Sequence, residues 1–198
     1  EKLKARYRAV QDAIKARRGA DSSTADSLFR DWHVVGPFPV ENTYPEEMHV
    51  DVDQLSLDAS YEGAGGGKVT WQRVVSEGKA RFGRQAVDLK NVLKGPNKDV
   101  CAYAVTTIES SRERDGVLYV GSDDSVTVWL NGEKVLAVDA TRAAHPDQNV
   151  ASVHLKKGRN LVLVRVGQRS GGWEFYFRLA NAFGVPLTDG VKYEPPIR

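Results

Sequence analysis

Short runs of apolar and β-branched residues, each bounded by turn-forming residues, make up most of the chain after residue 28. Such runs predict β-strands. Several alternate with period two; in 125–130 the aliphatic residues share one face, while Ser125, Thr127 and Trp129 share the other. The predicted strands are 30–35, 69–75, 100–108, 116–120, 125–130, 133–138, 150–155, 161–166 and 173–180. No long helical pattern lies between them, so the sequence predicts an all-β, antiparallel sandwich or barrel.

The turns between these runs support hairpins. Asn131 and Gly132 separate two predicted strands, and both tolerate the positive φ that a type I′ turn requires. A second turn over 157–160 follows the strand at 150–155. There Gly158 is expected to supply the positive-φ corner and Asn160 to cap the turn with its side chain.

The first 18 residues show a different periodicity, which predicts a short N-terminal helix that ends near Gly19. Its apolar face consists of Leu3, Tyr7, Val10 and Ile14. Basic residues cover the other sides, so the helix could bind a membrane surface or a partner. In the alternative interpretation, which we favour, the helix connects to a preceding helical domain and docks through its apolar face. This face lacks the Trp and Phe of a membrane-surface anchor.

The chain therefore divides into three segments. Residues 1–27 form the amphipathic helix and a polar linker, and residues 28–185 form the β-sandwich. Residues 186–198 contain the proline-rich stretch VKYEPPIR, which predicts an extended C-terminal linker.

Charge and composition exclude two classes of partner. The net charge of +2 is too small for a nucleic-acid-binding surface, and the basic residues are spread along the chain. No run of eighteen apolar residues exists, so no membrane span is expected. The chain opens at Glu1 without an apolar signal segment, which suggests a processed or excised piece of a longer protein.

No catalytic motif is apparent. Cys101 lies alone inside a strand-like run and is expected to be a small buried hydrophobe. The four histidines lack metal-ligand spacing, and the chain contains no nucleophile elbow or phosphate-binding loop. Nothing singles out a carboxylate pair for glycoside hydrolysis. The sequence therefore predicts a protein that is not an enzyme.

Three segments together resemble a known family. They are FRDWHVVGPFP, GVLYVGSDDSVTVWLNGEKVL and VASVHLKKGRNLVLVRVGQRSGGWEFYFRL. Their order resembles galactose-binding-like jelly-roll domains, including the sugar-binding domain of β-galactosidase-type glycoside hydrolases, and is similar to protective-antigen-type lectin domains. The resemblance implies a jelly-roll sandwich that binds a glycan and adjoins other domains of the same polypeptide. It also implies an extracellular, periplasmic or cell-surface location.

The resemblance to protective-antigen-type lectins assigns a role to one pair of residues. In those lectins an aspartate pair before a similar hairpin holds calcium, and the calcium holds sugar hydroxyls. Carried over, Asp123 and Asp124 would be calcium ligands and ligand-binding residues. In the alternative interpretation, Asp123 caps a turn and Asp124 pairs with an arginine.

The four tryptophans are candidates for stacking against sugar rings. Trp129 lies on the more polar face of its strand, so it is the best candidate for an accessible ring. Trp173 follows a Gly-rich loop and is the second candidate. Trp32 and Trp71 are expected to lie in the core or at the edge between the sheets.

These observations favour a non-catalytic carbohydrate-binding module of a larger protein. The alternative is a structural or interaction domain without a small-molecule ligand, and a hydrolase acting alone is the least favoured. A binding module is expected to expose an aromatic ring beside polar side chains, whereas a structural module is expected to bury its tryptophans.

Overall fold

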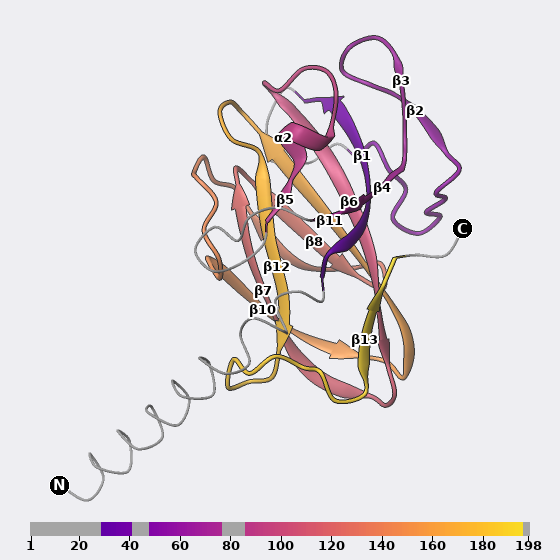
Figure 1. Cartoon of the computed structure of the whole chain (residues 1–198), viewed down its shortest axis with the longest axis vertical. Helices are drawn as coiled ribbons and strands as arrows, with labels where there is room; N and C mark the ends of the chain where they lie inside the picture. Colours follow the sequence, from indigo (N-terminus) through magenta and orange to yellow (C-terminus); the bar gives the residue numbers. More distant parts are fainter. Residues whose placement is uncertain (1–28, 41–47, 77–85, 196–198) are drawn as a thin grey trace, which may run out of the picture.

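A computed structural model describes residues 29–40, 48–76 and 86–195, which form an antiparallel β-sandwich (Figure 1). The predicted all-β fold class is therefore confirmed. The predicted helix over 1–18 and the linker that follows it lie outside the described residues. Within the described ranges, no helix is long and apolar enough to cross a membrane.

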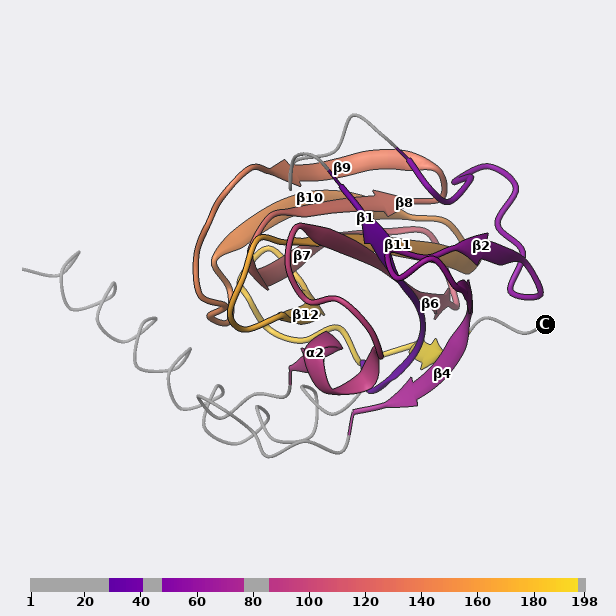
Figure 2. The ribbon, with the colours of Figure 1, turned by 90° about the horizontal axis from the view of Figure 1, so that it is seen from above.

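The sandwich consists of two sheets and a separate hairpin. The large sheet has the order β4 (Gln72–Val75), β1 (Asp31–Pro39), β6 (Val100–Ser110), β11 (Gly158–Gln168), β8 (Val126–Leu130), β9 (Glu133–Val138), and β13 (Val191–Glu194) also pairs with β6. The small sheet has the order β10 (Asn149–Leu155), β7 (Arg114–Asp123), β12 (Glu174–Ala180), β5 (Val87–Asp88). The hairpin pairs β2 (Ser60–Glu62) with β3 (Lys68–Thr70). A one-turn helix, α2 (Leu89–Val92), follows β5 and contacts β12 (Figure 2).

The predicted strands agree with the observed ones except at one position. The run 69–75 is divided at Trp71 into β3 and β4, which belong to different sheets. The short strands β2, β5 and β13 were not predicted, because two to four residues carry too little alternation to be recognised.

The main core lies between the two sheets. Trp32 on β1 is fully buried, and its ring meets Phe175 and Phe177 of β12 edge to face at 5.1 and 5.4 Å between centroids. Val126, Val128 and Leu130 also face this core, as the alternation in β8 predicts. Burial of these large apolar surfaces is the main stabilising term of the sandwich.

A second core covers the outer face of the large sheet. Residues from 48 to 71, including the β2–β3 hairpin, pack on this face, on the far side of the large sheet from β12, β7 and β10 (Figure 1). Trp71 and Trp129 both belong to this second core, and Trp129 is only 6% exposed. The expectation of an accessible Trp129 ring is therefore wrong, because a segment far away in the sequence covers the more polar face of β8. Cys101 is buried here, as expected.

The hairpin between β8 and β9 is confirmed. Asn131 and Gly132 have φ angles of 53° and 85°, so both adopt the left-handed conformation that the turn requires. The Asn131 side chain also accepts a hydrogen bond from the Leu161 amide at 2.9 Å and donates to the Asn160 side chain at 3.0 Å. Asn160 in turn caps the turn at Gly158, accepting from the Lys156 amide at 2.9 Å, as predicted.

Replacing Gly132 by valine is expected to lower the free energy of unfolding by about 1 kcal/mol or more, because a β-branched residue resists positive φ. Urea denaturation measures this loss. Gly67→Val is the matched control, since Gly67 lies in an exposed loop, has ordinary φ and has open space around its Cα. Equal losses in the two variants would contradict the role of the turn.

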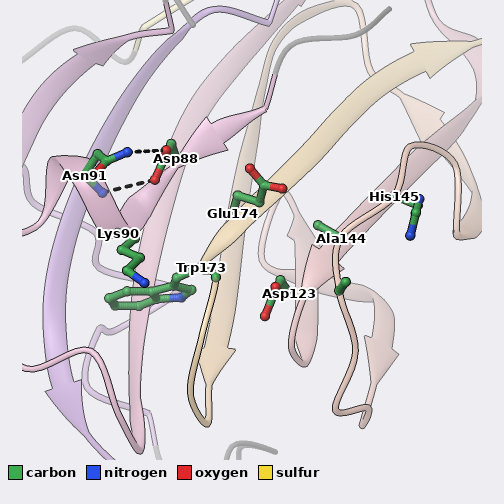
Figure 3. A pocket seen from close by; sticks show the side chains of 10 residues that line it. Asp88, Lys90, Asn91, Asp123, Ala144, His145, Trp173 and Glu174 are labelled. Carbon is green, nitrogen blue, oxygen red and sulfur yellow. Dashed lines mark hydrogen bonds between the residues drawn. The ribbon is translucent and has the colours of Figure 1, made fainter. Parts of the chain in front are cut away.

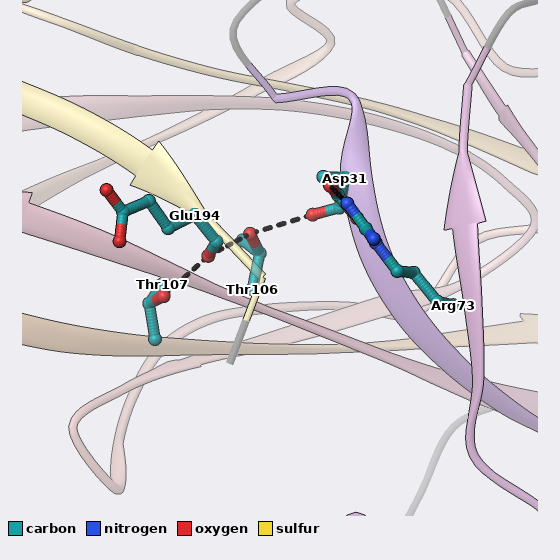
Figure 4. Close-up of polar contacts among 5 residues, drawn as sticks. All are labelled: Asp31, Arg73, Thr106, Thr107 and Glu194. Carbon is teal, nitrogen blue, oxygen red and sulfur yellow. Dashed lines mark hydrogen bonds and ion pairs between the residues drawn. The ribbon is translucent and has the colours of Figure 1, made fainter. Parts of the chain in front are cut away.

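The first and last described strands share one edge of β6. Residues 100–105 of β6 pair with β1, and residues 107–110 pair with β13. The Thr106 hydroxyl lies 3.0 Å from the Asp31 carbonyl oxygen and 3.3 Å from that of Glu194, which Thr107 also contacts (Figure 4). Residues 191–194 are thus a strand of the large sheet, and the prediction of an extended linker over 186–198 is wrong for this stretch, because it pairs with β6, a strand far away in the sequence.

Candidate functional site

Three carboxylates lie in a row at one end of the small sheet. Glu174, at the start of β12, is paired with Asp88 of β5 on one side and with Asp123 of β7 on the other. Directly paired residues of antiparallel strands project from the same face. Because the next residue, Phe175, faces the core, the row lies on the outer face of the sheet.

A pocket of about 220 Å³ opens around this row. Lys90 and Asn91 of α2 lie on one side, and the loop segment 143–145 lies on the other. Figure 3 shows Glu174 between Asp88 and Asp123, with Ala144 and His145 beyond Asp123. The pocket therefore combines hydrogen-bond acceptors with a lysine, an amide and an imidazole.

Two groups in the pocket wall are already held by neighbours. The Asp88 carboxylate caps α2 by accepting from the amide and the side chain of Asn91, at 3.0 and 2.6 Å. The Lys90 ammonium donates to the carbonyl oxygen of Gly171 at 2.6 Å. These bonds fix the α2 side of the pocket.

Asp123 is different, because its carboxylate makes no hydrogen bond or ion pair with the residues that the structure describes. Partial burial, followed by the charges of Asp124 and Glu174, raises the pKa of Asp123 to about 6, while Lys90 opposes the shift. An open carboxylate with a raised pKa facing a pocket is a candidate ligand-binding group.

Replacing Asp123 by asparagine is expected to stabilise the protein above pH 6. A carboxyl whose pKa is raised by folding destabilises the native state when it ionises, so the cost develops as the pH rises from about 4 to about 6 and persists above. We expect Asp123→Asn to be about 1 kcal/mol more stable at pH 8, less than the full shift implies because the group is partly solvated, and equal to wild type near pH 4.

Urea denaturation at the two pH values tests this expectation. Glu113→Gln removes the same charge from an exposed position outside the pocket and serves as the control. An Asp123→Asn variant less stable than wild type at pH 8 would show that the ionised carboxylate is a stabilising group.

Asp124 points away from the pocket and is only 2% exposed. Its two carboxylate oxygens accept hydrogen bonds from the backbone amides of Arg142 and Arg169, each at 2.8 Å. The peptide bond between Asp123 and Asp124 is cis. The alternative prediction that Asp124 pairs with an arginine is therefore wrong, since the donors are backbone amides and not guanidinium groups.

The predicted calcium site finds no ligand set among the described residues. In the ranges that the structure describes, no group of three or more His, Cys, Asp and Glu residues is arranged to hold a metal ion. Calcium requires six to eight oxygen ligands. Asp123 and Asp124 alone do not fit that requirement, and calcium binding stays a prediction.

Trp173 lines the pocket but does not expose its ring. It is 2% exposed, packs in the main core, and donates its indole N–H to the Val166 carbonyl at 3.3 Å. The expectation of an accessible ring at Trp173 is therefore wrong, because the strand that follows the Gly-rich loop turns the indole inward. Neither Trp129 nor Trp173 offers a stacking surface.

The loop that carries residues 143–145 is fixed in several ways. Gln148 accepts from the Ser122 amide at 3.0 Å and donates to the Ala143 carbonyl at 2.9 Å. The Arg178 guanidinium, which lies over the Tyr119 ring, makes two hydrogen bonds of 2.8 Å to Asp147. These contacts hold the loop against the outer face of the small sheet.

Several pocket residues were not predicted from the sequence. They are Asp88, Lys90, Asn91, His145 and Glu174. An Asp followed three residues later by Asn is a weak capping signal for α2, but the row of carboxylates depends on the pairing of three strands. Only Asp123 and Trp173 of the predicted site residues line the pocket.

No family model matches the chain, and no curated protein matches it. Similar solved structures include the PA14 domain of the MpAFP antifreeze protein, with 18% identity, a TM-score of 0.42, and coverage of 52% of this chain and 56% of that one. The β-glucosidase from Kluyveromyces marxianus in complex with glucose has 16% identity, a TM-score of 0.46, and coverage of 77% and 16%. An anti-sigma factor domain-containing protein has 10% identity, a TM-score of 0.44, and coverage of 87% and 49%. The chain thus spans less than two thirds of each of these proteins, and similarity at this level assigns no function.

Proposed function

We propose that this domain is a non-catalytic module that binds a carbohydrate, with the pocket beside Asp123 as its binding site. One observation carries the proposal: Asp123 lines the pocket with a carboxylate that has no hydrogen-bond or ion-pair partner among the described residues. Its pKa, raised to about 6, implies that the ionised carboxylate lowers the stability of the fold. Groups that destabilise a fold while facing a pocket are typical of functional sites.

The chemistry of the pocket suits sugar hydroxyl groups, each of which both donates and accepts hydrogen bonds. The Asp123 carboxylate is an acceptor, whereas the ammonium of Lys90 and the amide of Asn91 provide donors. The volume of about 220 Å³ is below the roughly 300–1,000 Å³ of pockets that enclose drug-sized ligands, so it suits one sugar residue. Because the tryptophans are buried, recognition would be polar and the affinity modest.

The arrangement of the carboxylates argues against glycoside hydrolysis. Hydrolysis requires two carboxyl groups that flank the scissile bond. Asp88, Glu174 and Asp123 project side by side from adjacent strands and so form a single wall. Because the described lining residues include no carboxylate that faces this wall, we propose binding and not bond cleavage.

The second candidate function is a structural or interaction domain without a small-molecule ligand. The burial of all four tryptophans favours it, because such a module is expected to use them as core. Phe183, which lies on the turn after β12 and is 74% exposed, also favours it as a contact for a neighbouring protein or domain. The sequence resemblance supports neighbouring domains of the same polypeptide and an extracellular, periplasmic or cell-surface location for either function.

A glycan array, followed by NMR titration with glucose, galactose and mannose, tests the proposal. We expect wild type to retain at least one glycan and Asp123→Asn to weaken its binding about tenfold or more, since hydrogen bonds to a charged acceptor are lost. Glu113→Gln is the charge-matched control and is expected to bind as wild type does. Retention of no glycan by wild type would leave the interaction domain as the better function.

Sugar binding measured with and without a chelator tests the predicted calcium separately. Sugar binding that disappears with a chelator and returns with calcium would support the predicted metal. Binding that is unchanged by the chelator but reduced in Asp123→Asn would support direct contact between carboxylate and sugar.

A further inference from the structure

The two neighbouring aspartates differ in what their carboxylates contact. Asp123 faces the pocket, whereas Asp124 is buried. Each carboxylate oxygen of Asp124 accepts one hydrogen bond of 2.8 Å, from the backbone amides of Arg142 and Arg169. Charged acceptors form stronger hydrogen bonds to backbone amides than neutral ones do. Asp124 therefore connects two segments that are distant in sequence.

Both segments lead directly into the walls of the pocket. Arg142 precedes the loop residues 143–145, and Arg169 precedes Gly172 and Trp173. One side of the pocket is thus anchored through Oδ1 of Asp124 and the other through Oδ2.

Asp124 is itself held by main-chain contacts. Its amide donates to the Gly167 carbonyl at 2.9 Å, and its carbonyl accepts from the Ser122 hydroxyl at 2.7 Å. The carboxylate is therefore a fixed point from which the two loops are positioned.

The charge of Asp124 has a second effect on the same loop. The Arg142 guanidinium is partly buried and donates to the Ser122 hydroxyl at 2.9 Å and to the Asn149 side chain at 2.6 Å. Burial lowers the pKa of Arg142, and the negative charge of Asp124 opposes that shift. An uncharged residue of the same shape would lose this compensation.

We propose that Asp124 is the positioning residue of the pocket: its two carboxylate oxygens set the separation of the loop segments that follow Arg142 and Arg169, and so set the shape of the site that Asp123 faces. This proposal rests on the proposed binding function of the pocket, and it adds a division of roles within the aspartate pair. Asp123 contacts the ligand, and Asp124 holds the site open for it.

Amide hydrogen exchange of the full chain, measured by NMR in EDTA, tests the positioning role without any ligand. In Asp124→Ala, exchange at Arg142 and Arg169 is expected to accelerate about tenfold or more relative to Val164, a core amide, because both acceptors are lost. In Asp124→Asn, one side-chain oxygen remains, so only one of the two amides is expected to accelerate. Asp123→Asn is the matched control and is expected to leave both rates unchanged relative to that of Val164.

Several outcomes would overturn the proposal. If exchange at Arg142 and Arg169 rises only in step with Val164, Asp124 stabilises the whole fold and does not position these loops. If Asp124→Ala does not fold, Asp124→Asn is the deciding variant. If neither amide exchanges faster in Asp124→Asn than in wild type, the two carboxylate oxygens do not position the loops.

Titration with glucose, galactose and mannose tests whether the hydrogen bonds of Asp124 to the two loops affect sugar binding. We expect Asp124→Ala to weaken the binding of any sugar that wild type retains by about tenfold, with Asp124→Asn intermediate. Accelerated exchange with undiminished sugar binding would overturn the positioning role. If wild type binds none of the sugars, the binding function fails, while the exchange data still decide the role of Asp124 in the loops.

Discussion

Replacing Gly121 by alanine is expected to destabilise the protein by about 3 kcal/mol, the upper end of the usual cost of overpacking. A Cβ atom at this position would lie 1.7 Å from the carbonyl oxygen of His145 and 2.8 Å from its carbonyl carbon. Both are backbone atoms of the pocket loop, so no side-chain rotation relieves the collision. The loop must move, and the pocket wall moves with it.

Thermal and urea denaturation measure this effect, and sugar titration measures the loss of the pocket. Gly67→Ala is the control, because a Cβ there meets no atom within 4 Å. A Gly121→Ala variant that unfolds with the wild-type midpoint would show that the loop does not pack on β7 as described.

Trp129→Ala is the second substitution with a large expected effect, a loss of about 3–5 kcal/mol in the free energy of unfolding. The ring is 6% exposed and packs in the second core with Leu163 and Trp71. Trp129→Phe keeps most of the apolar volume and is expected to cost much less. Calorimetry or urea denaturation of the two variants gives the comparison.

The same pair of variants separates core packing from sugar stacking. If Trp129 supports only the fold, Trp129→Phe is expected to bind sugar as wild type does. Normal stability of Trp129→Ala together with a loss of sugar binding would show instead that the ring is an exposed ligand platform.

Local signals predicted the strands well where they were strong. The Asn131-Gly132 turn and the alternation of β8 specify a hairpin without help from distant residues. The burial of Trp129 could not be predicted from local sequence. The segment that covers it lies at 48–71, and no local pattern indicates that contact. For the same reason, the local sequence predicts a linker where β13 pairs with β6.

The pocket was less predictable than the fold. Its row of carboxylates arises only when the registers of β5, β7 and β12 bring Asp88, Asp123 and Glu174 side by side. One signal was present in the sequence, since a glycine within a strand often marks the close approach of another backbone, and Gly121 lies beneath the pocket loop. The aspartate pair indicated the region in which the pocket lies, but only strand pairing and burial distinguish the contacts of Asp123 from those of Asp124.

The shared edge of β6 has a mechanical consequence. The carbonyl oxygens of Asp31 and Glu194 both accept hydrogen bonds from the Thr106 hydroxyl. A stretching force applied through the two flanking segments would therefore act at one place in the large sheet. The shortest path for that force runs from β1 through Thr106 to β13. Tension would therefore strain the contacts of Thr106 and Thr107 first, while the small sheet and its pocket stay outside the path of the force.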